Sequence, residues 1–339
     1  MTEKMTAIDY FVPPDKNSIR IEYEKRAPLY KQLAEEMEFI LDKEINKRDI
    51  KIHMIKSRIK EFDSFYRKIE VKECRNPFEG IEDICGVRIV CLYPSDLERI
   101  GKMIEDLFLV KETSRKVGEI PSNQFDYSAT HYIVTLKSEQ MKGPRYDDLR
   151  NLKCEVQVRT ILTDAWASVS HHLFYKKDID VPSDLKRDFY ALMGLFYVAD
   201  THFELLKNRK EKMIGQLQES IEAHKFELEQ ELNLETLKAY LEWKFPDRKA
   251  GDTERDAFRN ISYLNYQLQL VGYKTLQELD QRINKTAGVI RRDEEMHKKQ
   301  HSAAFRFYSV GAMRVCMRAA DENFARVEDE LTKGIVKKR

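Results

Sequence analysis

Three polar residues, Glu155, Gln157 and Arg159, alternate along the chain with Val156 and Val158. If the segment is a β-strand, alternation places the polar residues on one face and the valines on the other. A carboxylate, an amide and a guanidinium side by side can bind a metal ion and orient a phosphate group. The alternative interpretation is a strand with one solvated face, as in any half-buried sheet.

A second acidic and a second basic residue, Asp83 and Arg88, lie at the entrance of another apolar segment. Asp83 and Glu155 can share a divalent metal ion, because carboxylate oxygens are the ligands that hard cations prefer. Arg88 and Arg159 then remain for phosphate groups. We therefore expect the two segments to meet at one site.

A run of cations with one hydroxyl precedes these segments: Arg58, Lys60, Ser64 and Lys68. On a helix, positions 60, 64 and 68 share one face, and the cluster can hold a triphosphate. The alternative is a solvated helix face, which describes most runs of lysine and arginine.

Tyr127 and His131 enter a further apolar segment. An aromatic ring there can stack on a purine, and an imidazole can contact a phosphate; simple packing of Tyr127 is the alternative. Farther along, Trp166 is expected in the core and His171 within reach of the cleft. The pair His171-His172 has no additional ligand at metal spacing, so we do not expect zinc.

The elements that position these residues are predicted from periodicity. Residues 22–68 carry apolar residues at helical spacing, which predicts two amphipathic helices. Strands are predicted at 87–92, 130–136 and 154–160, and helices at 94–107 and 162–176. The stretch 111–125 is polar and basic without a clear period, and we expect a functional loop there.

A few strands interleaved with helices, without a regular βαβ repeat, indicate an α+β domain in which helices flank a mixed or antiparallel sheet. We expect this domain over residues 22–205. Residues 206–339 are charged and helical in pattern, with no evident strand, which predicts a separate all-helical domain. Its stretch 207–241 is interpreted as a connector or a coiled-coil-like pairing surface, and its final helix is predicted at 305–331.

Composition sets the broad class. The 339 residues, 42% of them hydrophobic, suffice for two domains with cores. The net charge is only +1, so any binding of nucleic acid requires a local patch. Five cysteines without a C-x-x-C pair favour packed thiols in a reducing compartment. No signal peptide opens the chain and no apolar run approaches the roughly 18 residues of a membrane span, so we expect a cytoplasmic protein with no membrane contact.

In order and spacing, the motifs resemble the synthetase domain of RelA/SpoT-type alarmone synthetases, including the small alarmone synthetases. They are Arg58-x-Lys60-x-x-x-Ser64-x-x-x-Lys68, the segment Ile81–Arg88, Tyr127-x-x-x-His131, Glu155-Val156-Gln157-Val158-Arg159-Thr160, and Asp164-Ala165-Trp166-Ala167 with His171 and Tyr175-Lys176. The helical domain lies outside the resemblance.

The resemblance implies a nucleotidyltransferase-like fold and transfer of a pyrophosphoryl group from ATP to the 3′-hydroxyl of GDP or GTP, giving (p)ppGpp and AMP. It implies magnesium as the cofactor, held by Asp83 and Glu155, and Glu155 is our predicted general base. The residues expected to bind ATP are Arg58, Lys60, Ser64, Lys68 and Arg88, with the two arginines enclosing the adenine. Those expected to bind the acceptor are Tyr127, His131, Gln157 and Arg159, with Tyr127 stacked on its base.

The chain departs from the family pattern where the acceptor is expected. The family commonly has a lysine before a Gly-Tyr pair and a serine after it, whereas this chain lacks that lysine and has Asp126 before Tyr127 and Ala129 after it. An acidic residue beside an acceptor's phosphates is unfavourable by about 1 kcal/mol or more, unless Arg115 or Lys116 compensates.

Alternative acceptors are therefore the 3′ end of tRNA, as in toxin-like relatives, and adenine nucleotides. A tRNA acceptor needs a basic surface near the cleft, for which Lys47, Arg48, Lys51 and Lys56 are the candidates. A different class of function, a non-catalytic nucleotide-binding scaffold, is a further alternative. A second copy of the chain, bound through the C-terminal helices, is an expected partner. The sequence shows no His-Asp hydrolase motif, so a bifunctional synthetase-hydrolase is not expected.

Overall fold

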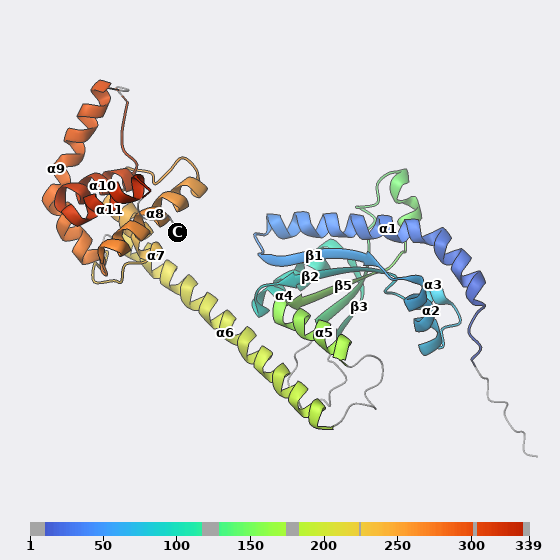
Figure 1. Cartoon of the computed structure of the whole chain (residues 1–339). Coiled ribbons are helices and arrows are strands. Elements are labelled where there is room, and N and C mark those ends of the chain that lie inside the picture. Colours follow the sequence, from blue (N-terminus) through green and yellow to red (C-terminus); the bar gives the residue numbers. More distant parts are fainter. Residues whose placement is uncertain (1–10, 117–128, 174–182, 224, 301–303, 335–339) are drawn as a thin grey trace, which may run out of the picture. The chain divides into compact units, whose positions relative to one another are not determined.

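The computed structural model describes residues 11–116, 129–173, 183–223, 225–300 and 304–334 (Figure 1). The contacts divide the chain into two compact units, Met1–Leu206 and Lys207–Arg339. The domain boundary expected from the sequence lies between residues 205 and 206. Each unit has its own hydrophobic core.

The first unit is built on a five-stranded sheet with the order β1-β2-β5-β4-β3. The strands are β1 (Ile52–Ile59), β2 (Cys85–Cys91), β3 (Leu109–Lys116), β4 (Ala129–Thr135) and β5 (Cys154–Thr160). β2 and β5 pair in parallel, and the other neighbouring pairs are antiparallel. The predicted α+β class with a mixed sheet is confirmed.

Helices complete this unit: α1 (Lys16–Lys47), α2 (Phe62–Val71), α3 (Pro77–Gly80), α4 (Pro94–Leu107), the 3-10 helix η1 (Pro144–Leu149) and α5 (Ile161–Leu173). α1 contacts β1 and β2, while α4 contacts β2, β3 and β5. Met37 of α1 and Met103 of α4 are fully buried in the same core as Val87, Val156 and Val158. One face of the sheet is thus apolar and covered, which leaves its polar face for the site.

The second helix predicted within residues 22–68 is wrong. Residues 52–59 form β1, and only the following segment is helical, as α2. Ile52, Ile55 and Ile59 fit a helical period, but they are β-branched, and β1 pairs with β2 along its whole length. Pairing between distant segments therefore decided the structure of this stretch.

The loop predicted at 111–125 is also wrong for its first part. Residues 109–116 form β3, the edge strand paired with β4. Residues 117–125 lie outside the described residues. The absence of a clear period is understandable, because Leu109 and residues 111–113 are all exposed and β3 therefore lacks the alternation of buried and exposed side chains.

The second unit is helical, as predicted. It contains α7 (Leu234–Lys244), α8 (Glu254–Val271), α9 (Leu276–Gln300), α10 (Ser309–Ala320) and α11 (Glu322–Thr332). α6 (Ser183–Glu222) contributes residues to both units. The single helix predicted at 305–331 is two helices, because the Asp321 carboxylate accepts hydrogen bonds from the backbone N–H of Asn323 and Phe324 and caps α11.

The cysteines are free, and those at positions 85, 91, 154 and 316 are buried. Packed thiols are thus confirmed. None of the described helices has both the length and the apolar character required to cross a membrane.

Candidate functional site

Polar side chains from four neighbouring strands lie on the uncovered face of the sheet. In the strand register, Lys56 of β1 is opposite Arg88 of β2, Arg88 is opposite Gln157 of β5, and Gln157 is opposite His131 of β4. Residues paired in register share a face. These side chains therefore form one row across the sheet, and Glu155 lies two positions before Gln157 on the same face.

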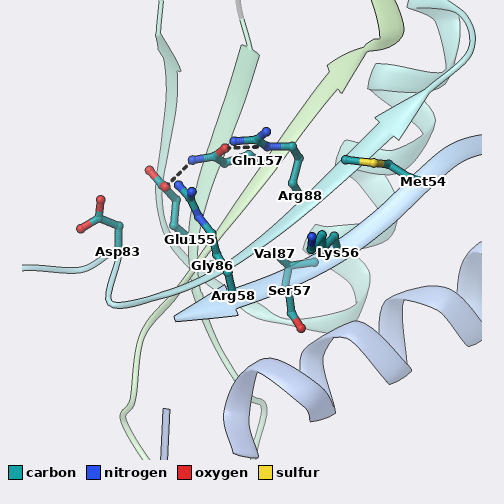
Figure 2. Close-up of a pocket in the computed structure, with 10 residues that line it drawn as sticks. All are labelled: Met54, Lys56, Ser57, Arg58, Asp83, Gly86, Val87, Arg88, Glu155 and Gln157. Carbon is teal, nitrogen blue, oxygen red and sulfur yellow. Dashed lines mark hydrogen bonds between the residues drawn. The ribbon is translucent and has the colours of Figure 1, made fainter. Parts of the chain in front are cut away.

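A cavity of about 230 Å³ opens on this face (Figure 2). It brings together two of the predicted ATP-binding residues, Arg58 and Arg88, and two residues of β5. The full lining consists of Met54, Lys56, Ser57, Arg58, Asp83, Gly86, Val87, Arg88, Glu155 and Gln157. Figure 2 shows the row Glu155–Gln157–Arg88 linked by hydrogen bonds, with Asp83 entering from the segment before β2. Both predicted metal-binding carboxylates thus line the same cavity.

Asp83 is held by two cations. Its Oδ2 atom lies 3.0 Å from Nζ of Lys60 and 2.5 Å from Nζ of Lys68. Burial raises the pKa of Asp83, but the hydrogen bond from Lys68 and the charges of Lys60 and Lys68 outweigh it, so the pKa lies below its usual value. The other carboxylate oxygen, Oδ1, is buried and has no hydrogen-bond partner in the described part of the chain.

Glu155 is buried and hydrogen-bonded through both oxygens. Nδ1 of His131 lies 2.8 Å from Oε1, and Nε2 of Gln157 donates to Oε2 at 2.6 Å. An ionised carboxylate only accepts, so Nδ1 of His131 carries the shared proton when Glu155 is ionised. His131, predicted at the acceptor phosphates, has Nδ1 committed to Glu155, which leaves Nε2 for any other contact.

Arg88 and Arg159, expected on the ATP side and the acceptor side, lie in one hydrogen-bond network. Both donate to Oε1 of Gln157, at 3.4 and 3.0 Å, and both donate to Oδ1 of Asp164, at 3.2 and 3.4 Å. Burial and the charge of Arg88 lower the pKa of Arg159 to about 10, while Asp164 and Glu155 act in the opposite direction.

One predicted residue, Ser64, is not joined to this network. Ser64 lies on α2 but is exposed and does not line the cavity. Tyr127 and the side chain of His171 lie outside the described residues. Trp166 is in a small core, stacked on Phe189 with ring centroids 3.7 Å apart, as expected.

From the sequence, Met54 was given no role, Lys56 was considered only for a tRNA-binding surface, and Asp164 appeared only as part of a motif. The signal for Lys56 and Met54 was their spacing of two and four residues from Arg58, which places all three on one face of β1 once the segment is a strand. Asp164 lies in the first turn of α5 and reaches the arginines only through the turn after β5. No periodic pattern marks such a residue.

Comparison with known proteins gives matches to the first unit. A family model described as a region found in RelA / SpoT proteins matches residues 57–180. GTP pyrophosphokinase YwaC of Bacillus subtilis is 34% identical over 141 residues, which are 40% of this chain and 63% of that relative. GTP pyrophosphokinase YjbM of the same organism is 25% identical over 138 residues, 40% of this chain and 62% of that relative. The chain therefore spans less than two thirds of the length of each relative.

Solved structures give weaker matches. Small alarmone synthetase 1 from Bacillus subtilis has a TM-score of 0.47 at 20% identity, covering 56% of this chain and 98% of that chain. A GTP pyrophosphokinase family protein from Streptococcus pneumoniae has a TM-score of 0.48 at 18% identity, covering 57% of this chain and 96% of that chain. The residues that match the model described as a region found in RelA / SpoT proteins include Arg58 and Arg88 of the cavity, both carboxylates and the whole of β5.

Proposed function

We propose that the first unit is an ATP-dependent pyrophosphokinase that transfers a pyrophosphoryl group from ATP to the 3′-hydroxyl of GDP or GTP. The observation that carries the proposal is the cavity in which Asp83 and Glu155 lie among basic side chains. Transfer of a highly charged group depends mainly on positioning and on neutralising negative charge. The names of the two sequence relatives support the same reaction class.

The donor is proposed to lie along β1 and the segment before β2. Lys60 and Lys68 meet at Asp83, and Arg58 lines the same cavity. Ammonium groups at one end suit the phosphates of ATP, and the guanidinium groups of Arg58 and Arg88 suit its base by stacking. Ser64 keeps a proposed role at the phosphates, although it does not line the cavity.

The residues present fit a magnesium ion. Oδ1 of Asp83 is buried without a partner among the described residues, and Glu155 supplies a second carboxylate in the same cavity. We propose that these two residues hold the ion, which when bound offsets the charge of the phosphates. The lysines now paired with Asp83 then become available to the phosphate oxygens.

Glu155 is the proposed general base. Its buried carboxylate is fixed by Gln157 and His131, so it is oriented before a substrate arrives. A proton removed from a ribose hydroxyl moves to a Glu155 oxygen, and the hydroxyl oxygen attacks the β-phosphorus of ATP. The bond from that phosphorus to the oxygen bridging it to the α-phosphorus breaks, and AMP leaves with that oxygen. Gln157 and Arg159 are proposed to orient the acceptor or the transferred group, and Tyr127 is proposed to stack on the acceptor base.

A tRNA acceptor requires a basic surface. Of the four candidates for it, Lys56 lines the cavity, and the other three are paired with acidic side chains. Lys47 and Arg48 pair with Glu44, Arg48 also pairs with Asp106, and Lys51 pairs with Asp49. The phosphate backbone is bound mainly through net positive charge. These pairs therefore favour a free nucleotide as the acceptor.

The test is to incubate the full chain with magnesium and ATP labelled in its terminal phosphate, in separate reactions with GDP, GTP, ADP and bulk tRNA. We expect labelled GDP or GTP products and an equal amount of AMP. Glu155→Gln is the inactive control, and Glu139→Gln, at an exposed position outside the cavity, is the matched active control. If label appears only in tRNA or only in ADP, that molecule is the acceptor in place of GDP or GTP. If the chain binds ATP but transfers no label, the non-catalytic scaffold is favoured.

A further inference from the structure

Asp164 connects two arginines that the proposed function places on different substrates. Its Oδ1 atom accepts from Nη1 of Arg88 at 3.2 Å and from Nη1 of Arg159 at 3.4 Å. Arg88 lines the cavity, whereas Arg159 is nearly completely buried. Asp164 is not among the residues that line the cavity, so it acts on a substrate only through these arginines.

Two guanidinium groups on neighbouring strands repel each other, and burial of one makes the repulsion costly. The position of Arg159 is fixed by the register of β5, in which it lies two pairs beyond the pair of Arg88 and Gln157. Gln157 bridges both groups through Oε1, but a neutral amide does not offset their charge. The carboxylate of Asp164 does so, and it contacts both arginines.

The position of Asp164 is itself fixed by the turn after β5. The hydroxyl of Thr160 accepts from the backbone N–H of Thr163 at 3.1 Å, which caps the first turn of α5. The same hydroxyl donates to Oδ2 of Asp200 at 2.6 Å. Both threonines and Asp200 are buried, so the carboxylate at position 164 starts from a rigid turn.

We propose that Asp164 is a positioning residue that holds Arg88 and Arg159 together and thereby couples the donor and acceptor halves of the site. This proposal rests on the proposed function for the identity of the two halves. The chain of contacts continues from Arg88 and Arg159 through Gln157 to Glu155. Loss of Asp164 is expected to disturb both substrates at once.

The donor half is tested by binding alone, with calorimetric titration of a non-hydrolysable ATP analogue and magnesium into the full chain. Asp164→Ala is expected to weaken analogue binding about 10-fold, as one charge-assisted contact to Arg88 is lost. Asp164→Asn, which keeps the shape and one acceptor oxygen, is expected to have a smaller effect. Asp147→Asn is the matched control, because Asp147 is exposed and pairs with the exposed Arg150.

The acceptor half is tested by the acceptor's KM, with the acceptor that receives label. Asp164→Ala is expected to raise this KM by about 10-fold through Arg159. In a chain that already carries Arg88→Gln, adding Asp164→Ala should no longer weaken analogue binding but should still raise the acceptor's KM. In a chain that carries Arg159→Gln, adding Asp164→Ala should weaken analogue binding but leave the acceptor's KM unchanged. If Asp164 had a purely structural role, its replacement would change analogue binding and the acceptor's KM by the same factors in both backgrounds.

Additive losses in both backgrounds, or lower thermal stability with unchanged analogue binding, would overturn the proposal. If Asp164→Ala does not fold, Asp164→Asn in the same two backgrounds decides the question. Loss of Mn²⁺ binding, measured by electron paramagnetic resonance with the analogue present, would instead make Asp164 a metal ligand and also overturn it. The calorimetric test of the donor half measures binding and needs no turnover. If the chain transfers no pyrophosphoryl group, this test can still be carried out, and the result counts only against the proposed function.

Discussion

Nδ1 of His131 lies 2.8 Å from Oε1 of Glu155, and each side chain is only 7% exposed. The residues belong to the neighbouring antiparallel strands β4 and β5. A buried hydrogen bond to a charged group contributes about 1.5–3 kcal/mol. The pair is therefore held rigidly on the sheet. Replacing Glu155 and replacing His131 are expected to affect catalysis differently.

Replacing Glu155 by glutamine is expected to leave binding of an ATP analogue largely unchanged while lowering turnover by at least about 100-fold, because the general base is lost. Single-turnover kinetics with labelled ATP measure the effect. Turnover within a few fold of the unmodified chain would remove Glu155 from this role.

Replacing His131 by leucine is expected to lower kcat by about 10-fold or more, with little change in the acceptor's KM, because the hydrogen bond that orients Glu155 disappears. Asparagine, which keeps an N–H donor, should retain more activity. Steady-state kinetics of the two variants separate the possibilities. A raised acceptor KM with unchanged kcat would show instead that His131 binds the acceptor's phosphates.

Replacing Asp83 by asparagine is expected to raise the magnesium concentration for half-maximal activity by about 10-fold or more, because a charged ligand of a hard cation is lost. Mn²⁺ binding in the presence of a non-hydrolysable ATP analogue gives a readout independent of activity. Asp63→Asn, on the exposed side of α2, is the control. An unchanged metal titration would exclude Asp83 as a ligand.

Replacing Lys68 by methionine is expected to move acid unfolding of the first unit to higher pH. Asp83 has a lowered pKa in the folded chain, so its stabilising effect is complete above its ordinary range and is lost as the pH falls through the lowered value. Without Lys68, burial raises the pKa of Asp83 and the loss begins earlier. Urea unfolding at a series of pH values from roughly 3 to 7 measures this; the exposed Lys72→Met is the control. Identical curves would contradict the assignment.

A chain that ends after Leu206 is expected to retain ATP binding and transfer but to change in activity level or in mass per assembly, because the second unit is proposed to regulate the enzyme or to pair with a second copy. The cut keeps the contacts of Asp200 with Thr160 and of Glu204 with the backbone of Ser95. Light scattering and kinetics are the measurements. Unchanged mass and activity would remove the regulatory role, and a soluble but inactive fragment would show that the second unit helps to build the site.

Prediction from the sequence succeeded where the alternation within a single strand determines the face on which a side chain lies. The alternation of β5 predicted that Glu155 and Gln157 share a face opposite Val156 and Val158, and the structure places them so. It failed for β1, where the same isoleucines satisfy a helical period and pairing with β2 is a long-range event.

The contacts among site residues were beyond sequence reasoning for a related reason. Lys60 and Lys68 were predicted at phosphates, but nothing in their spacing indicates that both meet Asp83. Asp164 appeared only as part of a motif, because its two partners lie on different strands and are brought to it by the fold. Periodicity assigns faces, whereas partners depend on tertiary packing.

Because β2 pairs in parallel with β5, the site depends on the number of residues between fixed positions in these strands. Arg88 faces Gln157 because Gly86 faces Glu155, two positions earlier. One residue inserted between Gly86 and Arg88 would turn Arg88 toward the apolar core and bring a hydrophobic side chain to the polar face. Homologous chains that keep this chemistry are therefore expected to vary freely in the loops around β2 and β5 while conserving the number of residues between these two positions.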